Sequence, residues 1–352
     1  MKTIKKLIAN PLSSMLFAIA FTVFVLYIVF KDNYLQIIEL LKTIQPIWFL
    51  LLLLIVLLYH FLIGLNLKVL VNSRGCKYTA WDGFVNALIA TFWHGVTPSA
   101  SGGQVGQMYV FKKQRVPSSD AAGVLWADFI IYQVVMVVTV FTLLILRFSY
   151  FRTHFSNMFL LVLLGFVINS FVIVILFVGV RFEKVYHLIT NGCVNLLVKF
   201  HILKNREDMV RNLNLQLDNF KKCADDFTRN KKVLIQCALL QLGRLLLYYA
   251  VPFFVVCSMD IVPLHSGNAL LLLLDCICLT AYVSMVNAFI PIPGASGGTE
   301  AIFVLMFSTI FGAVQASAMM ALWRFYTYYL LMIIGAATFI IFKNFYHKSS
   351  EI

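Results

Sequence analysis

Charged residues are scarce in this chain of 352 residues, of which only 12% are Asp, Glu, Lys or Arg. That is about half the share in a typical soluble domain. Hydrophobic residues make up 61% of the chain, which leaves no room for a soluble catalytic domain. Acids are the scarcer sign, and the net charge is +13. In a soluble chain this balance would suggest nucleic acid, but in a membrane protein the charges must first be assigned to loops.

Motifs for several kinds of chemistry are also missing. No glycine-rich nucleotide-binding loop with its lysine occurs, which argues against ATP as a driving force. No Ser-His-Asp spacing or metal-ligand cluster occurs, so we expect no catalytic residues, no metal and no cofactor. His60 and His94 lie in apolar context and are expected to be hydrogen-bonded packing residues. The seven cysteines mostly lie in apolar runs, which favours reduced packing thiols over disulfides.

Apolar runs of membrane-spanning length, about 20 residues or more, are abundant. We therefore expect an all-α polytopic membrane protein with about six full transmembrane helices, at 12–30, 46–71, 121–146, 158–180, 233–258 and 316–342. The first run is too long for the core of a signal peptide, and no small-residue cleavage site follows it. It is interpreted as a retained helix.

Lys and Arg in short loops mark the cytoplasmic side of a membrane protein. This rule places both termini in the cytoplasm of a multi-pass cell-membrane protein. It also places the loop 181–232 there, with its eleven Lys and Arg. We expect this insertion to contain an amphipathic helix on the anionic inner leaflet, with a partner-docking helix as the alternative.

Two apolar segments are interrupted by nearly the same word, TPSASGGQ at 97–104 and IPGASGGT at 292–299. The arm 83–96 has 14 residues, roughly 21 Å as a helix, and cannot cross an apolar core of about 30 Å. The segment 83–111 is therefore predicted to be a re-entrant hairpin that enters from the cytoplasm. The segment 268–313 must begin and end outside, as a hairpin or as two short spans.

The two parts of the chain, 1–150 and 158–345, are predicted to be inverted repeats. Each has the order helix, helix, broken segment, helix, and VLWADFIIY at 124–132 resembles ALWRFYTYY at 321–329. Breaks at matching positions of inverted repeats mark the substrate site of many transporters. The breaks predict two half-sites for a polar substrate near the membrane centre. The alternative is a pair of Pro/Gly kinks that assist helix packing.

Free amide groups at the start of each outgoing arm predict an anion site, assisted by the helix dipole. The predicted substrate-binding residues are Ser101, Gly102, Gly103, Gln104, Asp128, Ser296, Gly297, Gly298, Thr299, Glu300 and Arg324. The basic side chains that follow the first hairpin could hold lipid phosphate or merely enforce orientation. These are Lys112, Lys113 and Arg115.

Charges within the bilayer are costly unless they are paired or wet, and most of those in this chain allow more than one interpretation. Asp128 and Arg324 occupy nearly equivalent places in the two repeats and are expected to face one cavity. Glu300 either caps the amides of its arm or contacts the substrate. Arg244 and Asp275 are expected to form a structural ion pair, with a functional role as the alternative.

The stretch TPSASGGQVGQMYVFKKQRVPSSDAA at 97–122 resembles the Pro-Gly-x-x-Gly-Gly and Arg/Lys-rich stretch of the lysylphosphatidylglycerol synthase transmembrane family. PIPGASGGTEAIFVLMF at 291–307 is similar to that family's Pro-x-Pro-Gly-Gly-x-Gly-x-x-Glu motif, with Glu300 as its acid. The resemblance covers 1–345. Ser99 stands where the first motif often has Gly, and Ala295-Ser296 widens the second, so the substrate is left open.

This resemblance implies a flippase that moves an anionic or aminoacylated phospholipid, or a glycolipid, between leaflets. Full-length relatives append a cytosolic transferase that uses lysyl-tRNA. We expect a stand-alone membrane domain without it, because the chain ends ten residues after its last predicted helix. The alternatives are a phosphatidylglycerol lysyltransferase, with lysyl-tRNA at the basic loop, and a membrane partner of a separately encoded lipid synthase. Otherwise no nucleic acid is expected, and homo-oligomerisation stays open.

Overall fold

The structure is a computed structural model of the chain. It describes residues 44–97, 102–148, 159–181, 229–260, 269–287 and 297–348, together with 35, 39, 42, 152, 226 and 227. All regular structure in these ranges is helical. Five helical segments in these ranges are long and apolar enough to cross a membrane. The expected all-α polytopic fold is confirmed.

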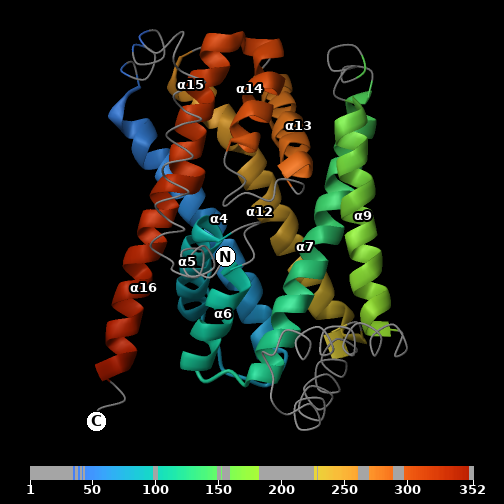
Figure 1. The fold of residues 1–352 in the computed structure, drawn as a ribbon, viewed down its shortest axis with the longest axis vertical. Helices are drawn as coiled ribbons and strands as arrows, with labels where there is room; N and C mark the ends of the chain where they lie inside the picture. The colour runs from blue at the N-terminus through green and yellow to red at the C-terminus, as the bar shows by residue number, and fades with distance from the viewer. Residues whose placement is uncertain are drawn as a thin grey trace, which may run out of the picture.

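Four long helices run along the bundle (Figure 1) and coincide with predicted spans. They are α4 (Pro46–Asn72), α7 (Ser118–Leu146), α9 (Phe159–Arg181) and α12 (Lys231–Ser258). The predicted helix 316–342 consists of three consecutive pieces. These are α15 (Ala313–Arg324), a π-helical turn η4 (Phe325–Tyr329) and α16 (Leu330–Lys348). The predicted helix 12–30 and nearly all of the insertion 181–232 lie outside the described residues.

Each broken segment forms a pair of short helices that pack against each other. The first pair, α5 (Ala80–Val96) and α6 (Gly102–Lys113), lies in the lower half of Figure 1. The second pair, α13 (Ala269–Asn287) and α14 (Gly298–Phe311), lies in the upper half. By length and composition α13 alone could cross a membrane, but in the bundle it ends partway down. The division into repeats 1–150 and 158–345 stays a prediction.

Local side-chain chemistry sets both ends of α5. At its start the Thr79 hydroxyl accepts a hydrogen bond from the Asp82 amide, and the Asp82 carboxylate accepts one from the Thr79 amide. This reciprocal cap satisfies two amides that have no partner in the first turn. At its end the Thr97 hydroxyl donates to the carbonyl of Trp93 and accepts from the amide of Gly102. The end of α5 is thereby bonded to the start of α6.

Glycines allow α5 to approach its neighbours at backbone distance. A Cβ atom on Gly83 would lie 2.1 Å from the carbonyl oxygen of Gly64 in α4. A Cβ atom on Gly335 of α16 would lie 2.4 Å from the carbonyl oxygen of Leu88. Small residues at helix contacts are a main device of packing within membranes. The short helix α5 is therefore held between α4 and α16 by close backbone contact.

Replacing Gly83 by Ala is expected to lower the thermal unfolding temperature of the detergent-solubilised protein by several degrees. The added methyl group would collide with the Gly64 carbonyl oxygen, and such overpacking costs about 1–3 kcal/mol. Gly243→Ala is the matched control, because its nearest neighbour, a Leu62 methyl, would be 3.8 Å away and alanine favours the helix. Equal unfolding temperatures for the two variants would contradict the close approach of α4 and α5.

Candidate functional site

Glu300 lies in the first turn of α14 and is 1% exposed. One of its carboxylate oxygens accepts a hydrogen bond from the amide of Gly297 at 2.5 Å. Gly297 has φ 85°, a left-handed conformation that glycine adopts without steric cost. Capping, one of the two roles expected for Glu300, is therefore present at the N-terminal end of α14, which we call its inner end.

Arg324, at the end of α15, provides the charge that balances Glu300. Its Nε donates to the other Glu300 oxygen at 2.7 Å, and its guanidinium lies over the Tyr328 ring, 4.5 Å from the centroid. The side chains of this pair are 7% and 1% exposed. A buried ion pair is costly to break, because the remaining partner becomes an uncompensated charge.

Tyr328 continues this line of contacts to the other broken segment. Its hydroxyl donates to the carbonyl oxygen of Gly95, in the last turn of α5, at 3.0 Å. Carbonyls in the last turn of a helix have no partner within the helix. A chain of contacts therefore runs from the N-terminal end of α14, through Glu300, Arg324 and Tyr328, to the C-terminal end of α5, which we call the inner end of α5. We call this chain the tip linkage.

The tip linkage passes through the π-helical turn η4, Phe325–Tyr329. Such turns are rare and are frequently found at functional sites. Arg324 directly precedes this turn, and Tyr328 lies within it. The two side chains that this helix contributes to the tip linkage therefore lie in the π-helical turn or directly before it.

A second polar cluster joins three long helices around Asp128. One oxygen of this carboxylate accepts hydrogen bonds from the side-chain amides of Asn66 in α4, at 2.6 Å, and of Gln241 in α12, at 2.8 Å. Both amide residues are completely buried. Asp128 and Arg324, which were expected to face one cavity, each have polar partners of their own in different clusters.

The expected ion pair between Arg244 and Asp275 is wrong. Asp275 in α13 instead pairs with Arg147, the residue that ends α7. Arg244 lies over the ring of Tyr132, with 4.4 Å from its guanidinium carbon to the ring centroid. The sequence placed both charges within apolar runs, but α13 contacts both α7 and α12, and the apolar pattern does not show which arginine the acid reaches.

The remaining predicted site residues are spread over several environments. Gly102, Gly103 and Thr299 are buried, Gly298 is half-buried, and Gln104 is exposed. Ser101 and Ser296 lie outside the described residues. The three basic residues at the end of α6 are exposed. These are Lys112, Lys113 and Arg115.

Histidines and cysteines are packing residues where the structure describes their contacts. The ring nitrogens of His60 lie 2.8 Å from the Val56 carbonyl oxygen and 2.9 Å from the Thr91 hydroxyl. The ring of His94 lies against Gly103, where a Cβ atom would be 2.1 Å away. The five described cysteines are free. Within the described ranges no group of three His, Cys, Asp or Glu side chains is placed to bind a metal ion.

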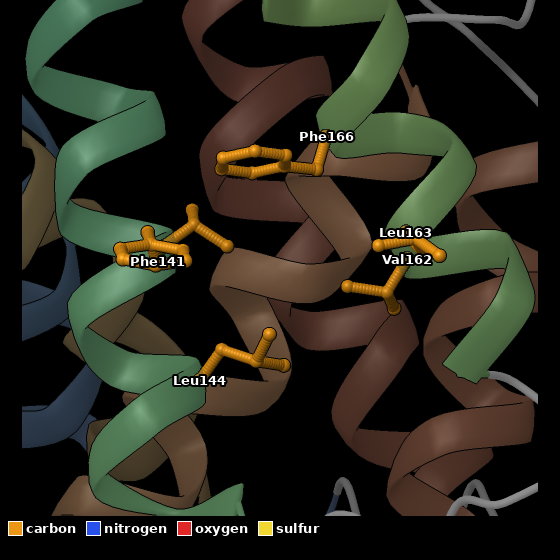
Figure 2. A pocket seen from close by; sticks show the side chains of 6 residues that line it. Phe141, Leu144, Val162, Leu163 and Phe166 are labelled. Carbon is orange, nitrogen blue, oxygen red and sulfur yellow. The ribbon is translucent and has the colours of Figure 1, made fainter.

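An apolar pocket lies between α7 and α9. Figure 2 shows Phe141 and Leu144 of α7 opposite Val162, Leu163 and Phe166 of α9. Its lining side chains offer no hydrogen-bonding group. It is therefore suited to hydrocarbon and not to a charged group.

Three side chains of these clusters were not predicted: Asn66, Gln241 and Tyr328. Asn66 and Gln241 were visible as polar residues within apolar runs, a signal that marks interhelical hydrogen bonding. Tyr328 gave no such signal, because tyrosine is common in apolar segments near membrane surfaces. Its role follows from the register of the π-helical turn.

The long apolar helices, together with acidic and basic side chains buried between them, define a multi-pass α-helical membrane protein. Residues 15–335 match the family described as the lysylphosphatidylglycerol synthase TM region. The chain belongs to this family. No curated protein and no solved structure matches it.

A double-mutant cycle on Glu300 and Arg324 tests the buried pair. Glu300→Ala and Arg324→Ala are each expected to reduce the free energy of unfolding by about 3–5 kcal/mol, because each leaves one charge buried without its partner. The double variant is expected to cost less than the sum of the single variants, by up to about 3 kcal/mol. Thermal or denaturant unfolding in detergent measures all four proteins.

Asp226→Asn is the control for this cycle. Asp226 pairs with Arg74 but is 61% exposed, and exposed pairs contribute less than about 1 kcal/mol. Strictly additive effects of Glu300→Ala and Arg324→Ala would contradict a direct ion pair between them.

Proposed function

We propose that the protein is a lipid transporter that moves an anionic or aminoacylated phospholipid, or a related glycolipid, between the two leaflets of a cell membrane. The single observation that carries the proposal is the tip linkage, through Glu300, Arg324 and Tyr328. It joins two broken helical pairs that lie in opposite halves of the bundle. Membership of the family supports a role connected with phospholipid.

Physical chemistry supports placing the transport path at the broken pairs. Interrupted helices in a membrane leave backbone groups that must be satisfied by protein or by a polar cavity. Transporters place such interruptions at matching positions of inverted repeats and bind substrate there. In this proposal the two pairs are inverted halves, and the tip linkage is the contact that must rearrange when a headgroup passes.

Asp128 and the basic end of α6 have separate roles in the proposal. Asp128 is half-buried, and one of its two carboxylate oxygens accepts the hydrogen bonds from both Asn66 and Gln241. We assign its other oxygen to cationic groups of an aminoacylated substrate. The exposed Lys112, Lys113 and Arg115 attract anionic headgroups to the entrance of the first pair, because basic residues near a membrane surface bind anionic lipid.

A role in lipid synthesis is the second candidate, because the family description names a synthase. In that case the chain would be a lysyltransferase or the membrane partner of a separate synthase. Purified protein supplied with lysyl-tRNA and phosphatidylglycerol distinguishes the candidates. Formation of lysyl-lipid would favour the enzyme.

Transport is tested in proteoliposomes that contain headgroup-labelled phosphatidylglycerol, with a membrane-impermeant quencher that reports the leaflet of the label. The wild-type protein is expected to move the label between leaflets much faster than empty liposomes do. Tyr328→Phe is expected to change the rate roughly 2- to 10-fold, the effect of one neutral hydrogen bond on a barrier. Tyr109→Phe is the matched control, because this exposed tyrosine packs its ring against the ring of Phe339.

Absence of movement with the wild-type protein, for phosphatidylglycerol and for lysylphosphatidylglycerol alike, would contradict the proposed function. Equal rates for Tyr328→Phe and Tyr109→Phe, with movement intact, would remove the tip linkage from the mechanism.

A further inference from the structure

Arg244 is a buried cation for which the described chain provides no anion. It lies halfway along α12, a helix of membrane-spanning length, and is 6% exposed. Among the described residues no carboxylate lies within ion-pair distance of it, and its Nε has no hydrogen-bond partner. Its guanidinium group lies over the Tyr132 ring. An arginine side chain carries a positive charge and five N–H donors and no acceptor.

The charged and titratable groups nearest to Arg244 form no direct bond with it. Asp128 lies one helical turn before Tyr132 on α7, but it forms no ion pair with Arg244, and one of its carboxylate oxygens accepts hydrogen bonds from Asn66 and Gln241. His60 lies within electrostatic range, but both its ring nitrogens have partners.

Unused hydrogen-bonding capacity extends from Arg244 along the same side of α12. Gln241 is one turn before Arg244, and its side-chain oxygen has no partner. The side-chain oxygen of Asn66, across from it on α4, has none either. Buried polar atoms without partners are rare in folded proteins and call for an explanation. A polar ligand that carries negative charge and hydroxyl groups would satisfy both the cation and the two amide oxygens.

We propose that Arg244 binds the phosphate group of a phospholipid during its passage through the bundle, a step that rests on the proposed function. The planar guanidinium donates two parallel hydrogen bonds to a phosphate, which an ammonium group does not do. The Asn66 and Gln241 oxygens accept hydrogen bonds from headgroup hydroxyls. In contrast to Arg324, Arg244 destabilises the free protein because its charge is unpaired. A bound phosphate pairs with this charge and offsets the destabilisation.

Replacing Arg244 is therefore expected to preserve or raise the stability of the free protein and to weaken its binding of the ligand. Arg244→Met removes an unpaired buried charge at similar volume, so the variant is expected to unfold at the same temperature as the wild type or a higher one. Arg324→Met, the matched control, is expected to unfold at a clearly lower temperature, because it leaves Glu300 without its partner. Thermal unfolding of the whole chain in detergent, followed by tryptophan fluorescence, provides this comparison.

Binding is measured by the rise in unfolding temperature with added ligand. Dioctanoyl phosphatidylglycerol is the lipid probe, dioctanoylglycerol is the same lipid without phosphate, and inorganic phosphate is the free anion. The wild type is expected to respond to the first and not to the second. Arg244→Met is expected to bind the phosphatidylglycerol probe about tenfold more weakly or worse, and Arg244→Lys to fall between them.

Each remaining outcome overturns the inference. A lower unfolding temperature or failed folding of Arg244→Met would show that Arg244 has a structural partner. Unchanged phosphatidylglycerol affinity in Arg244→Met and Arg244→Lys would remove the phosphate site. If inorganic phosphate raised the unfolding temperature as much as the phosphatidylglycerol probe does, the site would bind a free anion and not a phospholipid.

The liposome assay separates this inference from the proposed function. If the wild type binds the probe through Arg244 but moves no lipid, the proposed transport fails and the phosphate site stands. If the wild type and Arg244→Met move lipid equally fast, transport stands and the role of Arg244 fails.

Discussion

Arg324 lies inside the bundle, where an arginine is tolerated only if its charge and its donors are satisfied. Glu300 supplies the charge, and the Tyr328 ring covers the guanidinium. Because Glu300 also caps the inner end of α14 through Gly297, one ion pair fixes the position of the second broken helical pair against α15. The hydrogen bond from Tyr328 to Gly95 extends this constraint to α5. The two broken pairs are thus connected through three side chains.

The same bundle contains a second arginine with the opposite arrangement. Arg244 has an aromatic neighbour but no carboxylate among the described residues, whereas Arg324 has both. A protein that spends free energy on an unpaired buried charge can recover it from an anionic ligand. The two arginines therefore differ in role. Arg324 holds the inner ends of the two broken pairs together, and Arg244 has the binding role that we propose.

Much of the fold could be predicted from the sequence, because apolar runs of spanning length are sufficient to define α4, α7, α9 and α12. Neighbour relations could not be predicted. Asp275 pairs with Arg147, 128 residues away in the chain, and no local pattern distinguishes that partner from Arg244. The π-helical turn within FYTYY was equally hidden, because its apolar pattern is that of an ordinary helix. Arg324 directly precedes this turn, and Tyr328 lies within it.

In the proposed architecture the two broken pairs enter the membrane from opposite sides and meet through the tip linkage. Exposed positions at their outer ends, Lys113 of α6 and Ala313 beside α14, allow a direct test. Each is replaced by cysteine in a background without the seven native cysteines, and sealed vesicles are treated with a membrane-impermeant maleimide. Labelling of Lys113→Cys and Ala313→Cys from opposite sides is predicted. Labelling of both from the same side would show that the two pairs do not enter the membrane from opposite sides.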